Sequence, residues 1–134
     1  MIYLDACALV KFIKSEEETN ALRTWREALE AGVELVSSEL ARLEITRALL
    51  RAGVDHARVP HYVGQAVRGI YLVDLTSTVL ARARAYPTPK LGTLDAIHLA
   101  SADPFRDELT GFVTYDHELA AAAGALGLPV VAPA

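Results

Sequence analysis

The sequence predicts an α/β fold in three layers, α/β/α, with a small central parallel sheet of about five strands. Short apolar runs alternate along the chain with segments of helical periodicity, which is typical of crossover units in a parallel sheet. The runs are rich in β-branched residues and carry few polar side chains, as expected of strands that are covered on both faces. Glycines and prolines separate the segments and indicate where each one ends.

The predicted elements follow one another with little chain left between them. Strands are expected over Ile2–Asp5, Glu34–Ser37, Ile70–Asp74, Gly111–Tyr115 and Pro129–Val131. Helices are expected near Ala8–Lys14, Glu17–Ala31, Ser38–Ala52, His56–Val67, Ser77–Ala85, Thr93–Ala102 and Asp116–Ala125. Gly32 and Gly53 fit helix C-caps, and Gly127 is expected to close the last helix before Pro129.

The composition predicts a single domain, residues 1–134, with a sizeable core. Hydrophobic residues make up 52% and charged residues 22%, which argues against long disordered segments. The one cysteine excludes an internal disulfide and fits a cytoplasmic location. The longest apolar run, Leu119 to Ala134, is too short and too weakly hydrophobic to span a membrane. The net charge of −4 argues against binding nucleic acid by bulk positive charge, but not against an enzyme whose acids are neutralised by metal.

Two acidic residues stand where predicted strands end. Asp5 follows the first strand, and Asp116 follows the strand in "GFVTYD". The carboxyl ends of parallel strands lie at one edge of a sheet, where ligands bind in open α/β folds. We therefore expect both carboxylates at the same edge.

Two further acids lie in segments that are otherwise apolar. Glu44 stands in "SSELARLEITRALL", whose helix is expected to begin at a Ser38 cap. Asp95 stands in "GTLDAIHLASA", in the first turn of a helix with Thr93 as its expected N-cap, where the helix dipole favours a negative charge.

Four clustered carboxylates would repel one another strongly. At about 4 Å and an effective dielectric of 20, each pair costs on the order of 4 kcal/mol. A divalent cation removes this repulsion, and ligation by carboxylates alone suits Mg²⁺ or Mn²⁺ better than Zn²⁺.

Each acid taken singly has a purely structural interpretation. Asp5 would cap a helix, and Asp95 and Asp116 would complement helix dipoles. Glu44 would form an ion pair with Arg47, three residues further on. Taken together, at strand ends and helix starts, the four favour a metal site.

Four blocks of the sequence resemble, in order, the motif blocks of PIN-domain nucleases. The blocks are "MIYLDACALVKF", "SSELARLEITRALL", "LGTLDAIHLASA" and "GFVTYDHELAAAAGALGLPVV", and the resemblance covers the whole chain. Within that family, the chain is similar in particular to the VapC ribonuclease toxins of bacterial toxin–antitoxin pairs. The resemblance implies a PIN-like α/β/α fold and an endoribonuclease that depends on Mg²⁺ or Mn²⁺.

Carried across block by block, the resemblance implies that Asp5, Glu44, Asp95 and Asp116 are the catalytic and metal-binding quartet. It also implies that Thr114, in "TYD", supports the site. The chain departs from the family pattern after Asp5, where Ala6 and Cys7 stand in place of the usual hydroxyl residues. Because a thiol is a weaker hydrogen-bond partner than a hydroxyl, support for Asp5 from this side is reduced.

The reaction expected from these residues is metal-assisted hydrolysis of RNA phosphodiester bonds, without a covalent nucleophile on the protein. Either Asp95 or Asp116 would help to orient or deprotonate the attacking water. Arg47 and Arg51 lie on the Glu44 side of their helix and would contact RNA phosphates, unless they belong to a solvated helix face. Lys11 and Lys14 would also contact RNA phosphates in one interpretation, but a structural role is preferred for both.

Two other residues near the quartet favour structural roles. His98, one turn after Asp95, is expected to be buried with a hydrogen-bonded partner, with a role as ligand or proton shuttle as the alternative. Cys7 is expected to be a small core residue rather than a reactive thiol.

The resemblance further implies a cognate VapB-like antitoxin that blocks the acidic groove, and a homodimer. Two rival interpretations remain open. One is a PIN nuclease that processes RNA or cuts structured DNA without a toxin role. The other is a non-catalytic module that binds a partner peptide or a metal.

Overall fold

Five parallel strands form one central sheet in the computed structural model, which describes residues 1–134. The strands are β1 (Ile2–Leu4), β2 (Leu35–Ser38), β3 (Ile70–Val73), β4 (Gly111–Val113) and β5 (Val130–Val131). Their spatial order is β3-β2-β1-β4-β5, and every neighbouring pair is parallel. The order reverses at the central strands β1 and β4, and ligands of such sheets bind beyond the carboxyl ends of the strands at this point.

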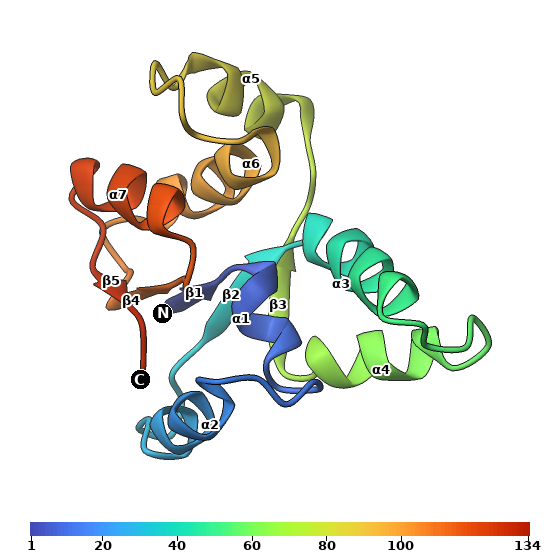
Figure 1. The fold of residues 1–134 in the computed structure, drawn as a ribbon. Helices are drawn as coiled ribbons and strands as arrows, with labels where there is room; N and C mark the ends of the chain where they lie inside the picture. Colours follow the sequence, from blue (N-terminus) through green and yellow to red (C-terminus); the bar gives the residue numbers. More distant parts are fainter.

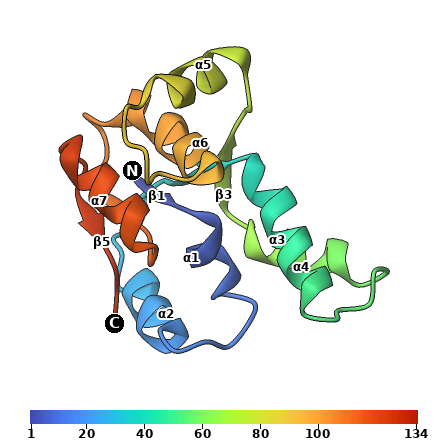
Figure 2. The ribbon, with the colours of Figure 1, turned by 45° about the horizontal axis from the view of Figure 1, so that its top comes forward.

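Seven α-helices cover the sheet on both faces. They are α1 (Ala6–Val10), α2 (Thr19–Glu27), α3 (Leu40–Arg51), α4 (Val59–Ala66), α5 (Ser77–Ala85), α6 (Thr93–Ala102) and α7 (His117–Ala125), and a 3₁₀ turn, η1 (Asp103–Phe105), follows α6. Helices α1 to α4 lie on one side of the sheet and α5 to α7 on the other (Figure 1, Figure 2). This confirms the predicted three-layer fold with a small parallel sheet. None of the helices has the length and apolar character needed to cross a bilayer.

The residues of β1 explain why this strand is apolar throughout. Ile2 and Leu4 are buried in a cluster with residues of α1 to α4, whereas Tyr3 is buried in a second cluster with residues of α6 and α7. Successive side chains of a strand point to opposite faces, so a strand between two layers needs apolar residues at every position.

The first two helices are shorter than predicted. α1 ends at Val10, and Phe12 and Ile13 continue its apolar pattern from a turn. In the same way, Leu29 and Val33 lie beyond the end of α2 and still pack against the core. The apolar spacing therefore reflects burial of these turns rather than continued helix.

The glycine predictions hold for two of the three positions. Gly53 and Gly127 directly follow the C-cap residues of α3 and α7 with φ of +83° and +81°, a region that glycine adopts without strain. Gly32 also has a positive φ, +90°, but it lies in the turn before β2, because α2 has already ended.

Two predicted N-caps are displaced by one residue. The N-cap of α6 is Gly92, and Thr93 is the first helical residue. The N-cap of α3 is Glu39, while the Ser38 hydroxyl accepts a hydrogen bond from the backbone N–H of Leu40 at 3.1 Å. Ser38 thus satisfies one free amide of the first turn from within β2.

Candidate active site

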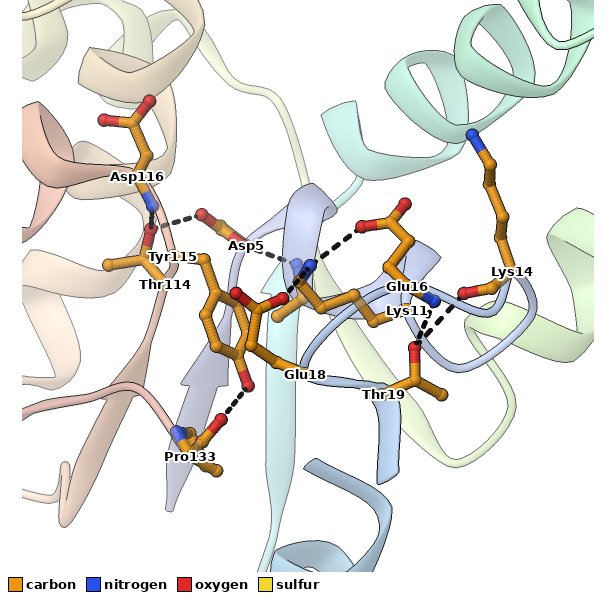
Figure 3. A network of polar contacts seen from close by, with 11 residues as sticks. Asp5, Lys11, Lys14, Glu16, Glu18, Thr19, Thr114, Tyr115, Asp116 and Pro133 are labelled. Atoms are coloured by element: carbon orange, nitrogen blue, oxygen red, sulfur yellow. Dashed lines mark hydrogen bonds and ion pairs between the residues drawn. The ribbon is translucent and has the colours of Figure 1, made fainter. Parts of the chain in front are cut away.

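Asp5 joins the end of β1 to the start of α1. Its side chain is almost fully buried, and Oδ1 accepts a hydrogen bond from the backbone N–H of Ala8 at 2.8 Å. Oδ2 accepts one from the Thr114 hydroxyl at 2.6 Å (Figure 3). Asp5 is therefore the N-cap of α1, which is the structural role expected of it from the sequence. It also belongs to a polar network that extends to Thr114, just after β4. The two roles use different oxygens.

Thr114 links two of the predicted acids. Its hydroxyl donates to Asp5 and accepts a hydrogen bond from the backbone N–H of Asp116 at 3.1 Å (Figure 3). Asp116 in turn caps α7, because its Oδ1 accepts from the N–H of Leu119 at 2.8 Å. Since β1 and β4 are parallel neighbours, Asp5 and Asp116 leave the sheet at the same edge, as predicted.

Glu44 reaches a partner on another helix. Its Oε1 lies 2.5 Å from Nε2 of His98, a fully buried residue of α6. An ionised carboxylate only accepts, so Nε2 carries the hydrogen of this bond. The Nδ1 of the same ring lies 2.8 Å from the hydroxyl of Tyr3 in β1. The prediction of a buried, hydrogen-bonded His98 is confirmed, while the ion pair of Glu44 with Arg47 is absent.

Asp95 is the third residue of α6 and is partly buried. Partial burial raises its pKa to about 6, helped by the negative charges of Asp116, Asp5 and Glu44 and opposed by His98. Burial likewise raises the pKa of Asp5, while its hydrogen bonds from Thr114 and Ala8 lower it. Asp95 therefore lies within electrostatic range of all three other predicted acids.

The negative charges of the four acids also act on Cys7, which lies in α1. It is exposed, which contradicts its expected place in the core, because it lies on the outer side of α1 while Ala6 and Ala8 are buried. Partial desolvation raises the pKa of its thiol to about 12, together with the charges of Asp5, Glu44, Asp95 and Asp116. At neutral pH the free thiol is therefore protonated, which disfavours it as a nucleophile.

The donor chemistry of the four acids suits a hard cation, because every predicted ligand atom is a carboxylate oxygen. No three His, Cys, Asp or Glu side chains lie close enough together to hold one ion among them. Mg²⁺ does not need such a cage, since it keeps several waters and takes one or two carboxylates directly. The residues present therefore fit a hydrated Mg²⁺ or Mn²⁺ ion.

Lys11 has a structural role, as preferred from the sequence. It is buried, and its Nζ lies 2.8 Å from Glu16 and 2.7 Å from Glu18 (Figure 3). It also lies 4.8 Å from the centre of the Tyr115 ring. Lys11 thus ties the chain before α2 to the end of α1 and is not available to substrate.

Tyr3 is the residue at this site that the sequence did not indicate. Its position in an apolar strand predicts burial, and its hydroxyl carries no separate signal in the pattern. Only the packing of β1 against α6 places that hydroxyl on His98.

Comparison with known proteins identifies the family. The family model described as "PIN domain" matches residues 2–125. Ribonuclease VapC47 of Mycobacterium tuberculosis (strain CDC 1551 / Oshkosh) is 39% identical over 140 residues, covering 99% of this chain and 97% of that protein. Ribonuclease VapC35 of M. tuberculosis (strain ATCC 25618 / H37Rv) is 40% identical over 138 residues, with the same coverage of both chains.

Solved structures share the fold at much lower identity. VapC20 of M. tuberculosis, described as a sarcin-ricin loop cleaving toxin, has a TM-score of 0.73 and 12% identity, covering 91% of this chain and 95% of that one. VapBC2 of Rickettsia felis, bound to a DNA fragment from its promoter, has a TM-score of 0.73 and 13% identity over 100% of both chains. With the family match and the full-length relatives, the chain belongs to the PIN-domain family and, within it, to the VapC ribonucleases.

Proposed function

We propose that this protein is an endoribonuclease dependent on Mg²⁺ or Mn²⁺, with Asp5, Glu44, Asp95 and Asp116 as its catalytic and metal-binding quartet. One observation carries the proposal. The Asp95 carboxylate makes no hydrogen bond, and its pKa is raised partly by the charges of the other three acids. Such unrelieved repulsion beyond the carboxyl ends of β1 and β4 favours a site that is completed by a cation. Membership of the VapC ribonucleases supports RNA as the substrate.

The chain's own residues supply orientation and proton chemistry. A bound cation would polarise the scissile phosphate and lower the pKa of a bound water. The Ala8 amide and the Thr114 hydroxyl fix the direction of the Asp5 carboxylate, and His98 fixes that of Glu44. Asp116 is engaged in capping α7, whereas Asp95 has both oxygens free. This difference favours Asp95 as the acid that orients the attacking water.

The proposed biological role is that of a toxin held inactive by a cognate VapB-like antitoxin. Structures of similar fold include a toxin–antitoxin complex from Klebsiella pneumoniae and the VapBC2 complex of R. felis. Large apolar side chains are exposed on α3, α5 and α6, which fits a homodimer or an antitoxin contact. RNA as a target places the expected action in the cytoplasm.

A cleavage assay tests the enzymatic proposal. Purified protein is incubated with tRNA, rRNA and mRNA under three conditions: with EDTA, with Mg²⁺ and with Mn²⁺. We expect cleavage by the wild type with metal only, and none by Asp95→Asn. Asp74→Asn is the matched control, because Asp74 is an exposed acid that also follows a strand, β3, but lies outside the quartet. Cleavage in EDTA, or full activity of Asp95→Asn, would overturn the assignment.

Induced expression separates the toxin from a nuclease without a toxin role. We expect growth arrest with the wild type and normal growth with Asp95→Asn. Cleavage in the assay without growth arrest would instead favour RNA processing.

A further inference from the structure

Two arginines beside the candidate active site have no partner. Arg47 and Arg51 follow Glu44 by three and seven residues, so they lie on the same side of α3. Both are exposed, and neither forms an ion pair or a side-chain hydrogen bond. By contrast, Arg42 on the same helix pairs with Glu39 at 2.8 Å. Glu44, three residues before Arg47, makes its contact with His98 on α6 and not with Arg47.

Two hollows adjoin at this position. The first, between α3 and the start of α6, has a volume of about 340 Å³ and is lined by Leu40, Leu43, Glu44, Arg47, Arg51 and Leu94. We call it the α3–α6 hollow. The second, of about 230 Å³, lies between α1 and α3 and includes Cys7, Glu16, Glu44 and Arg51 in its wall. Glu44 and Arg51 line both hollows, so one predicted metal ligand and one free cation stand between them.

The α3–α6 hollow combines two kinds of surface. Arg47 and Arg51 provide guanidinium groups, which match phosphate oxygens in a bidentate manner. Leu43 is 59% exposed and Leu94 is 49% exposed, so the same hollow presents apolar surface to solvent. Each nucleotide of a single-stranded nucleic acid offers a phosphate and a flat nucleobase. The nucleobases bind on apolar and guanidinium surfaces, so the two kinds of surface in the hollow match the two parts of a nucleotide.

We propose that the α3–α6 hollow is an RNA subsite, in which Arg47 and Arg51 hold phosphates next to the scissile one and Leu43 and Leu94 pack against a nucleobase. The inference rests on the proposed ribonuclease function. A protein with a net charge of −4 needs local cations to hold a polyanion, and these two are the free ones at the quartet.

Binding is measured without cleavage, in the full-length Asp95→Asn protein, by fluorescence anisotropy of a labelled single-stranded RNA. Arg47→Ala and Arg51→Ala are each expected to weaken binding by roughly 5- to 10-fold. Each is also expected to reduce the slope of log K against log salt concentration by about 0.7, the value for one lost phosphate contact on a single strand. Arg42→Ala is the matched control and leaves both quantities unchanged. Affinity and slope equal to the parent in both test variants would overturn the subsite.

The apolar half of the hollow has its own test. Leu94→Asn and Leu43→Asn are expected to weaken RNA binding while leaving the salt slope unchanged, because no charge is removed. The molecular mass of the same variants is measured by light scattering. Variants that turn from dimer to monomer with unaltered RNA binding would assign the hollow to an interface between copies and overturn the proposal.

The two proposals fail in different ways. A wild type that cleaves no RNA with either metal contradicts the ribonuclease. A wild type that cleaves RNA while both arginine variants bind it like the parent contradicts only the subsite.

Discussion

The side chains of His98 and Glu44 meet at 2.5 Å although the two residues are 54 positions apart in the sequence. The ring of His98 is fully buried, and its other nitrogen faces the Tyr3 hydroxyl. The contact therefore runs from the centre of the sheet to a carboxylate that is still partly open to solvent. It fixes the direction of the Glu44 side chain, which lines both hollows beside α3.

His98→Ala is expected to impair metal binding without touching a metal ligand. Loss of a hydrogen-bonding group behind a ligand typically costs about 10- to 100-fold in metal affinity or activity. Calorimetric titration with Mn²⁺ measures the metal affinity. Urea unfolding measures how far removal of the buried His98 ring lowers the free energy of unfolding. Tyr3→Phe is the comparison: it removes the hydrogen bond to Nδ1 of His98 but keeps Nε2 beside Glu44, so it should cost less metal affinity than His98→Ala. Wild-type Mn²⁺ affinity in a folded His98→Ala protein would contradict a positioning role.

Thr114→Val is expected to destabilise the protein and weaken metal binding together. The substitution keeps the shape of the side chain but removes the donor to Asp5 and the acceptor of the Asp116 N–H. Leaving such buried groups without a partner costs about 1–3 kcal/mol. Thr114→Ser retains the hydroxyl and should keep metal affinity close to that of the wild type. Urea unfolding measures the stability of both variants, and titration with Mn²⁺ measures their metal affinity. Equal Mn²⁺ affinities in Thr114→Val and Thr114→Ser would refute the role of the hydroxyl in metal binding.

The sequence predicted the fold because the decisive information is local. Each strand is a short apolar run, and the alternation with helical segments leaves few arrangements other than a parallel sheet. The position of Asp5 and Asp116 after two strands followed from the same reasoning, since parallel neighbours end at one edge.

What the sequence could not predict depends on tertiary packing. The pairing of Glu44 with His98 instead of Arg47 requires α3 and α6 to meet, which no local pattern encodes. The exposure of Cys7 depends on which side of the short helix α1 faces the sheet. The hydrogen bond from the Thr114 hydroxyl to Asp5, whose role in the site the family resemblance implied, likewise depends on the pairing of β1 with β4.

Metal-free protein is expected to become more stable on Asp95→Asn at neutral pH. The folded-state pKa of Asp95 is about 6, above its ordinary value of 3.8, so the native state binds the proton more tightly than the unfolded chain does. The contribution of Asp95 to the stability of the wild type therefore falls as pH rises from about 4 to about 6 and stays reduced above that range. Thermal unfolding in EDTA should show a gain for Asp95→Asn at pH 7 that disappears near pH 4. A gain independent of pH, or none, would contradict the charge repulsion.

Cys7 provides a chemical readout of the acidic quartet that does not depend on RNA cleavage. Its pKa is raised to about 12 by partial desolvation and by the charges of all four acids, so its reaction with iodoacetamide at neutral pH should be slow. Asp95→Asn removes one of those charges, and the alkylation rate should therefore rise. Mg²⁺ should accelerate the wild type by the same mechanism, though only in part, because desolvation, the larger cause, remains. Asp74→Asn serves as the control with unchanged rate. If the rate were indifferent to both Mg²⁺ and Asp95→Asn, the thiol would not share a field with these carboxylates, and the quartet would lose its electrostatic support.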